Sequence, residues 1–117
     1  EDFVFEHLAF VACDDEQPVA AIGCERLGKS WLLRSLVVAD GQRSRGLGAR
    51  LVEALEADAR DQGVGEIWLL TIDAYGFFES LGYRRRKRDE APEVIQRTAE
   101  FSDLCPASAV LMSRPLA

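Results

Sequence analysis

The stretch Arg43-Ser44-Arg45-Gly46-Leu47-Gly48-Ala49 lies between an apolar segment, Trp31 to Val38, and a long amphipathic segment that begins at Leu47. A strand, a turn with basic residues and glycines, and a helix start favour phosphate binding, because the first helical N–H groups lack internal partners and carry partial positive charge. Glycine lets a ligand approach the backbone, and arginine pairs with phosphate oxygens. The stretch predicts a site for a phosphorylated ligand, with a tight turn that binds nothing as the alternative.

The spacing of the glycines and arginines narrows the choice among known phosphate-binding motifs. The chain contains no Gly-x-x-x-x-Gly-Lys-Ser/Thr sequence, which disfavours a P-loop nucleotidase. It also lacks a Gly-x-Gly-x-x-Gly turn with an acidic residue after the next strand, which disfavours a dinucleotide fold. The remaining pattern, Arg43-x-x-Gly46-x-Gly48, resembles the pyrophosphate loop Arg/Gln-x-x-Gly-x-Gly/Ala of the GNAT superfamily of acetyl-coenzyme A-dependent N-acetyltransferases.

Other segments carry the same resemblance. The run Leu36-Val37-Val38 matches the strand that lines the pantetheine arm, and Ala74 to Tyr83 resembles the second signature of the superfamily. Two further segments, Leu33-Arg34-Ser35-Leu36 and Thr98 to Ala109, resemble the N-acetyltransferases encoded in bacterial and archaeal arsenic-resistance operons. The resemblance runs from Gly23 to Met112 and implies an α/β (α+β) fold: a mixed, mostly antiparallel sheet with a central parallel strand pair and flanking helices.

The length of 117 residues predicts one domain, residues 1–117. Apolar periodicity and turn residues predict a hairpin first, and then a strand, helix and strand that form a parallel βαβ unit. The expected strands are Phe10–Cys13, Val19–Arg26, Trp31–Val38, Glu66–Thr71, Tyr83–Arg88 and Ala107–Met112, and the expected helices run from Leu47 to Gly63 or Gly65, Tyr75–Ser80 and Pro92–Glu100. The strand and helices with which the superfamily usually begins have no counterpart here, and Glu1 to Leu8 is interpreted as the remnant of a helix.

Composition and charge bound the class and the partners. Apolar residues make up 48% and charged residues 29%, as in soluble globular proteins, and no segment resembles a membrane span or a signal peptide. The net charge of −6 argues against a nucleic-acid partner, and the basic run Arg84 to Arg88 is expected to form a solvated strand edge. The three cysteines lack metal-ligand spacing, so we expect no metal site, reduced thiols and a cytoplasmic protein.

The resemblance implies acetyl-coenzyme A as co-substrate and assigns residues to it. The superfamily opens its two central strands into a wedge, so an N–H near Val38 is expected to polarise the thioester carbonyl. Phe78 is placed beside the cofactor, where many members have a tyrosine that protonates the departing thiolate. The backbone of Leu36, Val37 and Val38 is expected to pair with the pantetheine amides, and the pyrophosphate is expected to lie on the main-chain N–H groups of Arg43, Ser44, Arg45, Gly46, Leu47, Gly48 and Ala49.

Few residues are candidates for the general acid or the general base. Tyr75 lies about one helical turn before Phe78 and is a candidate acid, with an aromatic of the surface or core as the alternative. Glu25 and Glu100 are candidate bases, each acting through a water within hydrogen-bond reach of the amine. Glu25 has a second interpretation, because Arg34 on the adjacent strand can form a structural cross-strand pair with it.

Two hypotheses about function follow. The first is an N-acetyltransferase that transfers acetyl directly to a small amine or an amino-acid-like acceptor, in arsenic or xenobiotic resistance. The second is a non-catalytic acyl-coenzyme A sensor or interaction module, which Phe78 in place of tyrosine and the lack of an obvious base favour. A homodimer through the sheet edge is compatible with both hypotheses.

Overall fold

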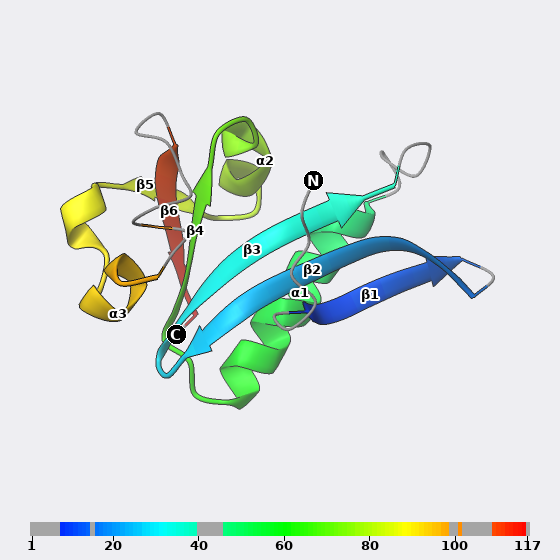
Figure 1. Ribbon diagram of the computed structural model, residues 1–117, viewed down its shortest axis with the longest axis horizontal. Coiled ribbons are helices and arrows are strands. Elements are labelled where there is room, and N and C mark those ends of the chain that lie inside the picture. The colour runs from blue at the N-terminus through cyan, green and yellow to red at the C-terminus, as the bar shows by residue number, and fades with distance from the viewer. Residues whose placement is uncertain (1–7, 15, 40–45, 99–100, 102–108, 117) are drawn as a thin grey trace.

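The computed structural model describes residues 8–14, 16–39, 46–98, 101 and 109–116. A six-stranded sheet in the order β1-β2-β3-β4-β6-β5 forms the centre, and helices flank it (Figure 1). The strands are β1 (Leu8–Asp14), β2 (Gln17–Leu27), β3 (Ser30–Val38), β4 (Glu66–Thr71), β5 (Arg84–Arg86) and β6 (Val110–Pro115), and the helices are α1 (Leu47–Asp61), α2 (Tyr75–Ser80), the 3-10 helix η2 (Arg88–Glu90) and α3 (Glu93–Gln96). Strands β3 and β4 run parallel and the other neighbours antiparallel, which confirms the predicted fold class.

The first three strands form two consecutive hairpins, the first of them as predicted. The β2–β3 ladder closes at the pair Leu27↔Ser30, which leaves a two-residue loop in which Gly28 has φ 78°. A tight hairpin turn needs this left-handed backbone, which glycine adopts without strain. Along β2 the buried side chains Ile22 and Cys24 alternate with the partly exposed Ala21 and Glu25, as expected for a strand that packs on one face.

The βαβ unit is also as predicted. Helix α1 buries an apolar stripe against the sheet, made of Leu47, Leu51, Val52, Leu55 and Ala59. The helix ends at Asp61, and Gly63 two residues later has φ 80°: its N–H donates to Arg60 O (3.1 Å) and the next N–H, of Val64, donates to Ala59 O (2.9 Å). These two bonds are the Schellman arrangement that satisfies the last carbonyls of a helix.

The parallel strands β3 and β4 stay together over a short length only. Their ladder comprises Ser30↔Glu66, Trp31↔Ile67 and Leu32↔Trp68. Further along, β3 has a bulge. The bulge is seen in the register against β2, which shifts between Ala21 and Gly23, and in the φ of Ser35, which is 59°. A bulge bends its strand, and the two strands separate beyond Leu32 (Figure 1).

The predicted strand Tyr83–Arg88 is too long, because both of its ends have other partners. Tyr83 is buried and its hydroxyl donates to Glu56 Oε2 of α1 (2.9 Å). After Arg86 the chain turns into η2, where the Lys87 N–H donates to Glu90 Oε1 (2.7 Å). The strand is therefore limited to Arg84–Arg86.

Two further boundaries also differ from the prediction. The helix predicted over Pro92–Glu100 is α3, which is shorter and ends at Gln96. The Thr98 hydroxyl donates to the Ile95 carbonyl (2.8 Å), which would accept a backbone N–H if the helix continued. The last strand extends to Pro115 because β6 pairs with the whole of β4. The predicted start of that strand, residues 107–108, lies outside the described residues.

Apolar cores lie on both faces of the sheet. The larger core packs α1 and the Phe78 side of α2 against β1 to β4, and the smaller core packs Ile95 of α3 against Leu32 and Trp68. Within the described ranges, no helix combines the length and the apolar character that crossing a membrane requires.

Candidate functional site

A cleft opens where β3 and β4 separate. Its volume is about 370 Å³, and it is lined by residues 33–36 of β3, residues 69–71 of β4, residues 72–74 and the α2 residues Phe77 and Phe78. We call it the β3–β4 cleft. Beyond Leu32, β3 has no ladder partner on its β4 side among the described residues. An extended ligand can therefore add to this edge through main-chain hydrogen bonds.

The predicted cofactor strand borders this cleft. Leu36 lines the cleft, while Val37 and Val38 pair through their other edge with Ala21 and Ala20 of β2. The role predicted for the backbone of these three residues is compatible with that arrangement and stays a prediction.

The first turn of α1 lies next to the cleft. Its N-cap is Gly46, in the left-handed region with φ 76°, and the Gly46 carbonyl accepts the Arg50 N–H (3.1 Å). Glycine supplies no capping oxygen and the first turn has no acidic residue, so none of the side chains that the structure describes competes with an anion for its N–H groups. Of the predicted phosphate loop, Gly46, Leu47, Gly48 and Ala49 are described, and residues 43–45 lie outside the described part of the chain.

Helix α2 forms the other wall of the cleft. Thr71 Oγ1 at the end of β4 accepts the Ala74 N–H (3.0 Å), which fixes the turn into the helix. The rings of Phe77 and Phe78 lie edge to face with centroids 5.0 Å apart. A Cβ atom at Gly48 would lie 3.3 Å from Phe77 Cζ, so the first turn of α1 lies close to this ring beside the cleft. Sequence analysis singles out Phe78 but not Phe77, whose only signal is the aromatic pair itself.

A buried polar cluster of Tyr83, Glu56 and Arg114 contacts α2 through Phe78. The Tyr83 ring packs edge to face on Phe78 (5.7 Å), and its hydroxyl donates to Glu56 Oε2. Arg114 Nη1 donates to Glu56 Oε1 (2.8 Å), so both oxygens of a carboxylate that is only 3% exposed have donors. Burial first, and the Glu56 carboxylate second, raise the pKa of Tyr83 above its usual range, which keeps this phenol neutral.

Tyr75, the candidate acid, does not line the cleft. Its hydroxyl donates to Glu79 Oε2 (3.1 Å), and the Arg85 guanidinium lies 4.6 Å from its ring centroid. It faces a separate shallow pocket beside β5. The structure therefore brings Phe78, but not Tyr75, to the cleft.

Of the candidate bases, Glu25 is described. Arg34 Nη1 donates to Glu25 Oε2 at 2.5 Å, and the two side chains are 11% and 15% exposed respectively. The cross-strand pair expected from the sequence is therefore present. Arg34 lines the cleft, whereas Glu25 does not, and a role for Glu25 as a base stays a prediction. Glu100 lies outside the described residues.

Metal ligands do not gather in the described ranges, which contain no group of three or more His, Cys, Asp or Glu side chains that could hold an ion. The lining of the cleft includes the edge of β3, the rings of Phe77 and Phe78, the Arg34 guanidinium and the Asp73 carboxylate. A strand edge of this kind suits an extended ligand with amide groups.

Two proteins of similar sequence are named as acetyltransferases. An uncharacterized N-acetyltransferase of Chlorobaculum tepidum is 38% identical over 65 residues, which are 56% of this chain and 41% of that protein. N-alpha-acetyltransferase 80 of Mus musculus is 46% identical over 55 residues, 47% of this chain and 18% of that protein. The chain thus spans less than half of the length of either relative.

Likeness of fold extends over nearly the whole chain. The structure of N-acetylglutamate synthase from Neisseria gonorrhoeae, complexed with coenzyme A and N-acetyl-glutamate, superposes with a TM-score of 0.80 at 17% identity, over 92% of this chain and 25% of that one. The sequence model of the acetyltransferase (GNAT) family matches residues 2–83, which include β1 to β4, α1 and α2. Because that match covers every element that builds the cleft, the chain belongs to the GNAT acetyltransferase family.

Proposed function

We propose that residues 1–117 form one acetyltransferase domain that binds acetyl-coenzyme A and transfers the acetyl group directly to the amine of a small acceptor. The observation that carries the proposal is the β3–β4 cleft, where the described residues leave the edge of β3 beyond Leu32 without a ladder partner and the first turn of α1 without a side-chain cap. The fold likeness to a synthase solved with coenzyme A supports the choice of cofactor.

Different segments of the chain are assigned to different parts of this cofactor. The N–H groups from Arg43 through Ala49 are assigned to the pyrophosphate, with Arg43 and Arg45 as charged partners. The backbone of Leu36 to Val38 is assigned to the pantetheine amides, with Phe77 and Phe78 packing on the arm. A main-chain N–H near Val38 polarises the thioester carbonyl.

The proposed reaction joins the acceptor nitrogen to the thioester carbonyl carbon and breaks the carbon–sulfur bond. The amine loses its proton through water to a base, for which Glu25 and Glu100 are the candidates. The sulfur leaves as a thiolate. With a thiol pKa of about 8.5 it is a tolerable leaving group, so the absence of a tyrosine at Phe78 does not prevent transfer.

An amino-acid-like acceptor is favoured by Arg34. Its guanidinium is held by Glu25 and lines the cleft, where it can bind a carboxylate of the acceptor. A role in arsenic or other xenobiotic resistance in the cytoplasm rests on the resemblance of residues 33–36 and 98–109 alone. An acceptor panel that contains organic arsenic compounds and plain amino acids distinguishes the two possibilities.

Binding of coenzyme A tests the proposal. Isothermal titration should give one site per chain, and Gly48→Glu should weaken it strongly, because a Cβ atom there already lies 3.3 Å from Phe77 Cζ and a carboxylate repels a pyrophosphate. Gly76→Glu is the matched control, since a Cβ atom there meets nothing within 4 Å. Arg43→Ala should also weaken binding, because it removes a charged partner of the phosphates. A complete lack of coenzyme A binding by the intact protein would contradict the proposal.

The second candidate function is an acyl-coenzyme A sensor without catalysis. It is favoured by the position of Tyr75 outside the cleft and by Phe78 within it. Release of free thiol from acetyl-coenzyme A with an amine panel separates the two candidates, because the sensor binds without turnover. Strand β5 forms a sheet edge, and gel filtration tests the proposed homodimer through it.

A further inference from the structure

The lining of the β3–β4 cleft contains a carboxylate that the sequence analysis did not single out. Asp73 follows the carboxyl end of β4, is exposed and lines the cleft. It is the only acidic residue among the described residues of that lining, and none of the described side chains forms an ion pair or a hydrogen bond with it. A carboxylate whose acceptor atoms are free beside a cleft suits a ligand that carries an ammonium group.

A hydrogen bond fixes the turn that carries Asp73. The hydroxyl oxygen of Thr71, a buried residue at the end of β4, accepts the Ala74 N–H (3.0 Å). The Ala74 carbonyl then accepts the Phe78 N–H (3.1 Å) in α2. Asp73 is therefore held between a strand and a helix, and this support limits the positions that its short side chain can reach.

Strand register brings Asp73 close to the assigned position of the thioester. The last pair of the β3–β4 ladder is Leu32↔Trp68, and the bulge adds one residue to β3 beyond it. Counted on from this pair, Val38 of β3 reaches about the level of Asp73 across the cleft. The proposed function assigns the thioester carbonyl to an N–H near Val38. An amine that attacks this carbonyl from the β4 side therefore approaches Asp73.

The other described candidates fit the amine less well. Glu25 does not line the cleft, and its carboxylate is bound to the Arg34 guanidinium. Protonation of Glu25 would weaken a pair whose two side chains are largely buried. Tyr75 faces the separate pocket beside β5 and donates to Glu79. Of these groups, Asp73 alone lines the cleft with acceptor atoms that no described residue uses.

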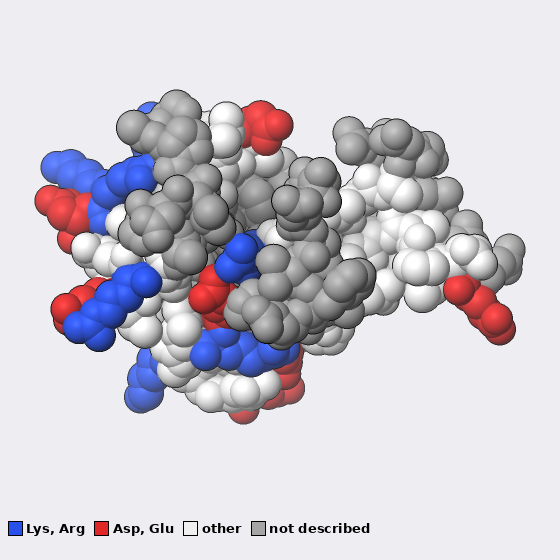
Figure 2. All heavy atoms as spheres, viewed as in Figure 1, with Lys and Arg blue, Asp and Glu red and all other residues white. Residues whose placement is uncertain are grey.

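The distribution of charge also favours a cationic amine at this place. The net charge of −6 attracts cations to the molecule. Figure 2 shows Lys and Arg gathered at the end that carries β5 and α3, whereas uncharged atoms predominate over the β1–β3 end. Arg34 is the one cation among the described residues that line the cleft, and Glu25 compensates its charge. The negative charge of Asp73 is therefore available to a ligand.

We propose that Asp73 binds the amine of the acceptor and receives its proton during acetyl transfer. The inference rests on the proposed function, because it names the amine-binding group of the same cleft. The amine nitrogen forms a bond to the thioester carbonyl carbon, the carbon–sulfur bond breaks, and the sulfur leaves as a thiolate. The proton that the nitrogen loses passes to the Asp73 carboxylate, directly or through one water, and from there to the solvent.

Turnover of acetyl-coenzyme A with the best acceptor of an amine panel tests this role. Asp73→Asn keeps the size of the side chain and removes its charge, and it should lower kcat/KM about a hundredfold. Asp73→Ala should be as slow, and added sodium formate should restore part of its rate by supplying a small carboxylate. Asp61→Asn is the matched control: Asp61 is exposed at the end of α1, outside the cleft lining, and the rate should stay at the parental value.

Coenzyme A affinity shows whether a lost rate comes from the amine site. Isothermal titration should give the same coenzyme A affinity for the parent, Asp73→Asn and Asp73→Ala. A parental kcat/KM in Asp73→Asn would overturn the inference and return the role to Glu25 or Glu100. A rate that formate does not restore, together with weakened coenzyme A binding, would show a structural role and would also overturn it. Loss of coenzyme A binding in the parent itself contradicts the proposed function instead.

Amine binding gives a measurement that does not need turnover. L-alanine should shift the amide signals of residues 71–74 in spectra of the ¹⁵N-labelled protein, with and without coenzyme A. Propionate has the same carboxylate but no ammonium group, so it should shift them much less. Asp73→Asn should remove this difference between the two ligands. Equal responses of the parent protein to L-alanine and propionate would overturn the inference, even in a domain that binds coenzyme A without catalysis.

Discussion

The hydroxyl of Tyr83 donates to Glu56 of α1 and so joins this helix to the aromatic wall of the cleft. We predict that Tyr83→Phe lowers the free energy of unfolding by about 1–3 kcal/mol, because one oxygen of a buried carboxylate loses its donor while the ring packing on Phe78 remains. Urea denaturation measures this change. Tyr75→Phe is the control: its hydroxyl bond to Glu79 is exposed, so a change within about 0.5 kcal/mol is expected. Equal effects of the two substitutions would contradict the assignment.

The same residue makes the stability depend on alkaline pH. Burial and the Glu56 carboxylate raise the pKa of Tyr83 in the folded protein, so the native phenol stays protonated where the unfolded one ionises. The contribution of Tyr83 is therefore complete below about pH 10, the unfolded pKa, and decreases as the pH rises above it. Unfolding curves of the parent and of Tyr83→Phe should converge above that pH. A constant difference across the alkaline range would show that the ionisation of Tyr83 is not coupled to folding.

Single residues also show what the sequence can and cannot indicate about the site. The Glu25–Arg34 pair was predictable, because neighbouring strands bring residues at known positions together. The direction in which Tyr75 points was not predictable. It depends on the guanidinium of Arg85 in β5, which lies over its ring, and the helical spacing of Tyr75 and Phe78 does not indicate that contact. Phe77 was missed for a similar reason: its importance lies in its contact with Gly48 of another helix.

Among the elements, those with their own start and stop signals were predicted best. β4 and α2 begin and end where the sequence indicates, because apolar runs and glycines define them locally. β5, α3 and β6 differ, since their ends are set by partners elsewhere in the chain. The opening between β3 and β4 was expected from the family resemblance alone, because main-chain separation has no side-chain pattern.

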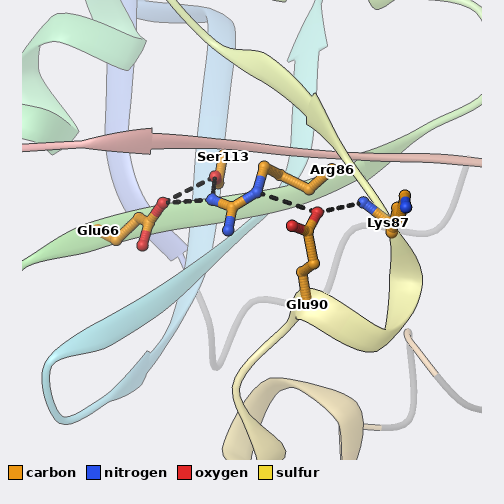
Figure 3. Close-up of polar contacts among 5 residues, drawn as sticks. All are labelled: Glu66, Arg86, Lys87, Glu90 and Ser113. Atoms are coloured by element: carbon orange, nitrogen blue, oxygen red, sulfur yellow. Dashed lines mark hydrogen bonds and ion pairs between the residues drawn. The ribbon is translucent and has the colours of Figure 1, made fainter.

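The C-terminal elements are joined by a polar cluster around Arg86 of β5 (Figure 3). Arg86 Nη1 donates to Glu66 Oε2 of β4 (3.0 Å) and to Ser113 Oγ of β6 (2.8 Å), while its Nε donates to Glu90 Oε1 of η2 (3.4 Å). The guanidinium also lies 4.8 Å from the ring centroid of Trp68. One planar side chain with several fixed donors thus connects β4, β6 and η2 to β5.

We predict that Arg86→Lys lowers the free energy of unfolding by about 1–2 kcal/mol, because an ammonium group cannot reproduce the divided donor geometry or the stacking on Trp68. Chemical denaturation followed by tryptophan fluorescence measures the change. Arg84→Lys, on the same strand but exposed, should be neutral within about 0.5 kcal/mol. If both variants have the same free energy of unfolding as the parent protein, the cluster does not stabilise the fold.

At the scale of the whole molecule, a short seam divides the single sheet into two parts, β1 to β3 and β4 to β6, while α1 contacts both parts. At this seam the parallel ladder between β3 and β4 extends, within the described residues, over Ser30–Leu32 only. The seam continues as the open β3–β4 cleft. Because an unpaired strand edge exposes amides that a ladder would protect, the free domain should exchange cleft-facing amides of residues 33–38 faster than those of the seam.

We predict that coenzyme A slows this exchange at both halves of the cleft. A ligand that binds only the folded state protects by RT ln(1 + [L]/Kd), about 2.7 kcal/mol or roughly a hundredfold at 100 times Kd. Hydrogen exchange followed by mass spectrometry should therefore show slower exchange in residues 33–38, in the first turn of α1 and around Thr71. The Arg84–Arg86 strand, at the far sheet edge, is the internal control and should not change. Protection that is uniform over the chain would indicate global stabilisation instead, and protection that spares the cleft would place the cofactor elsewhere on the fold.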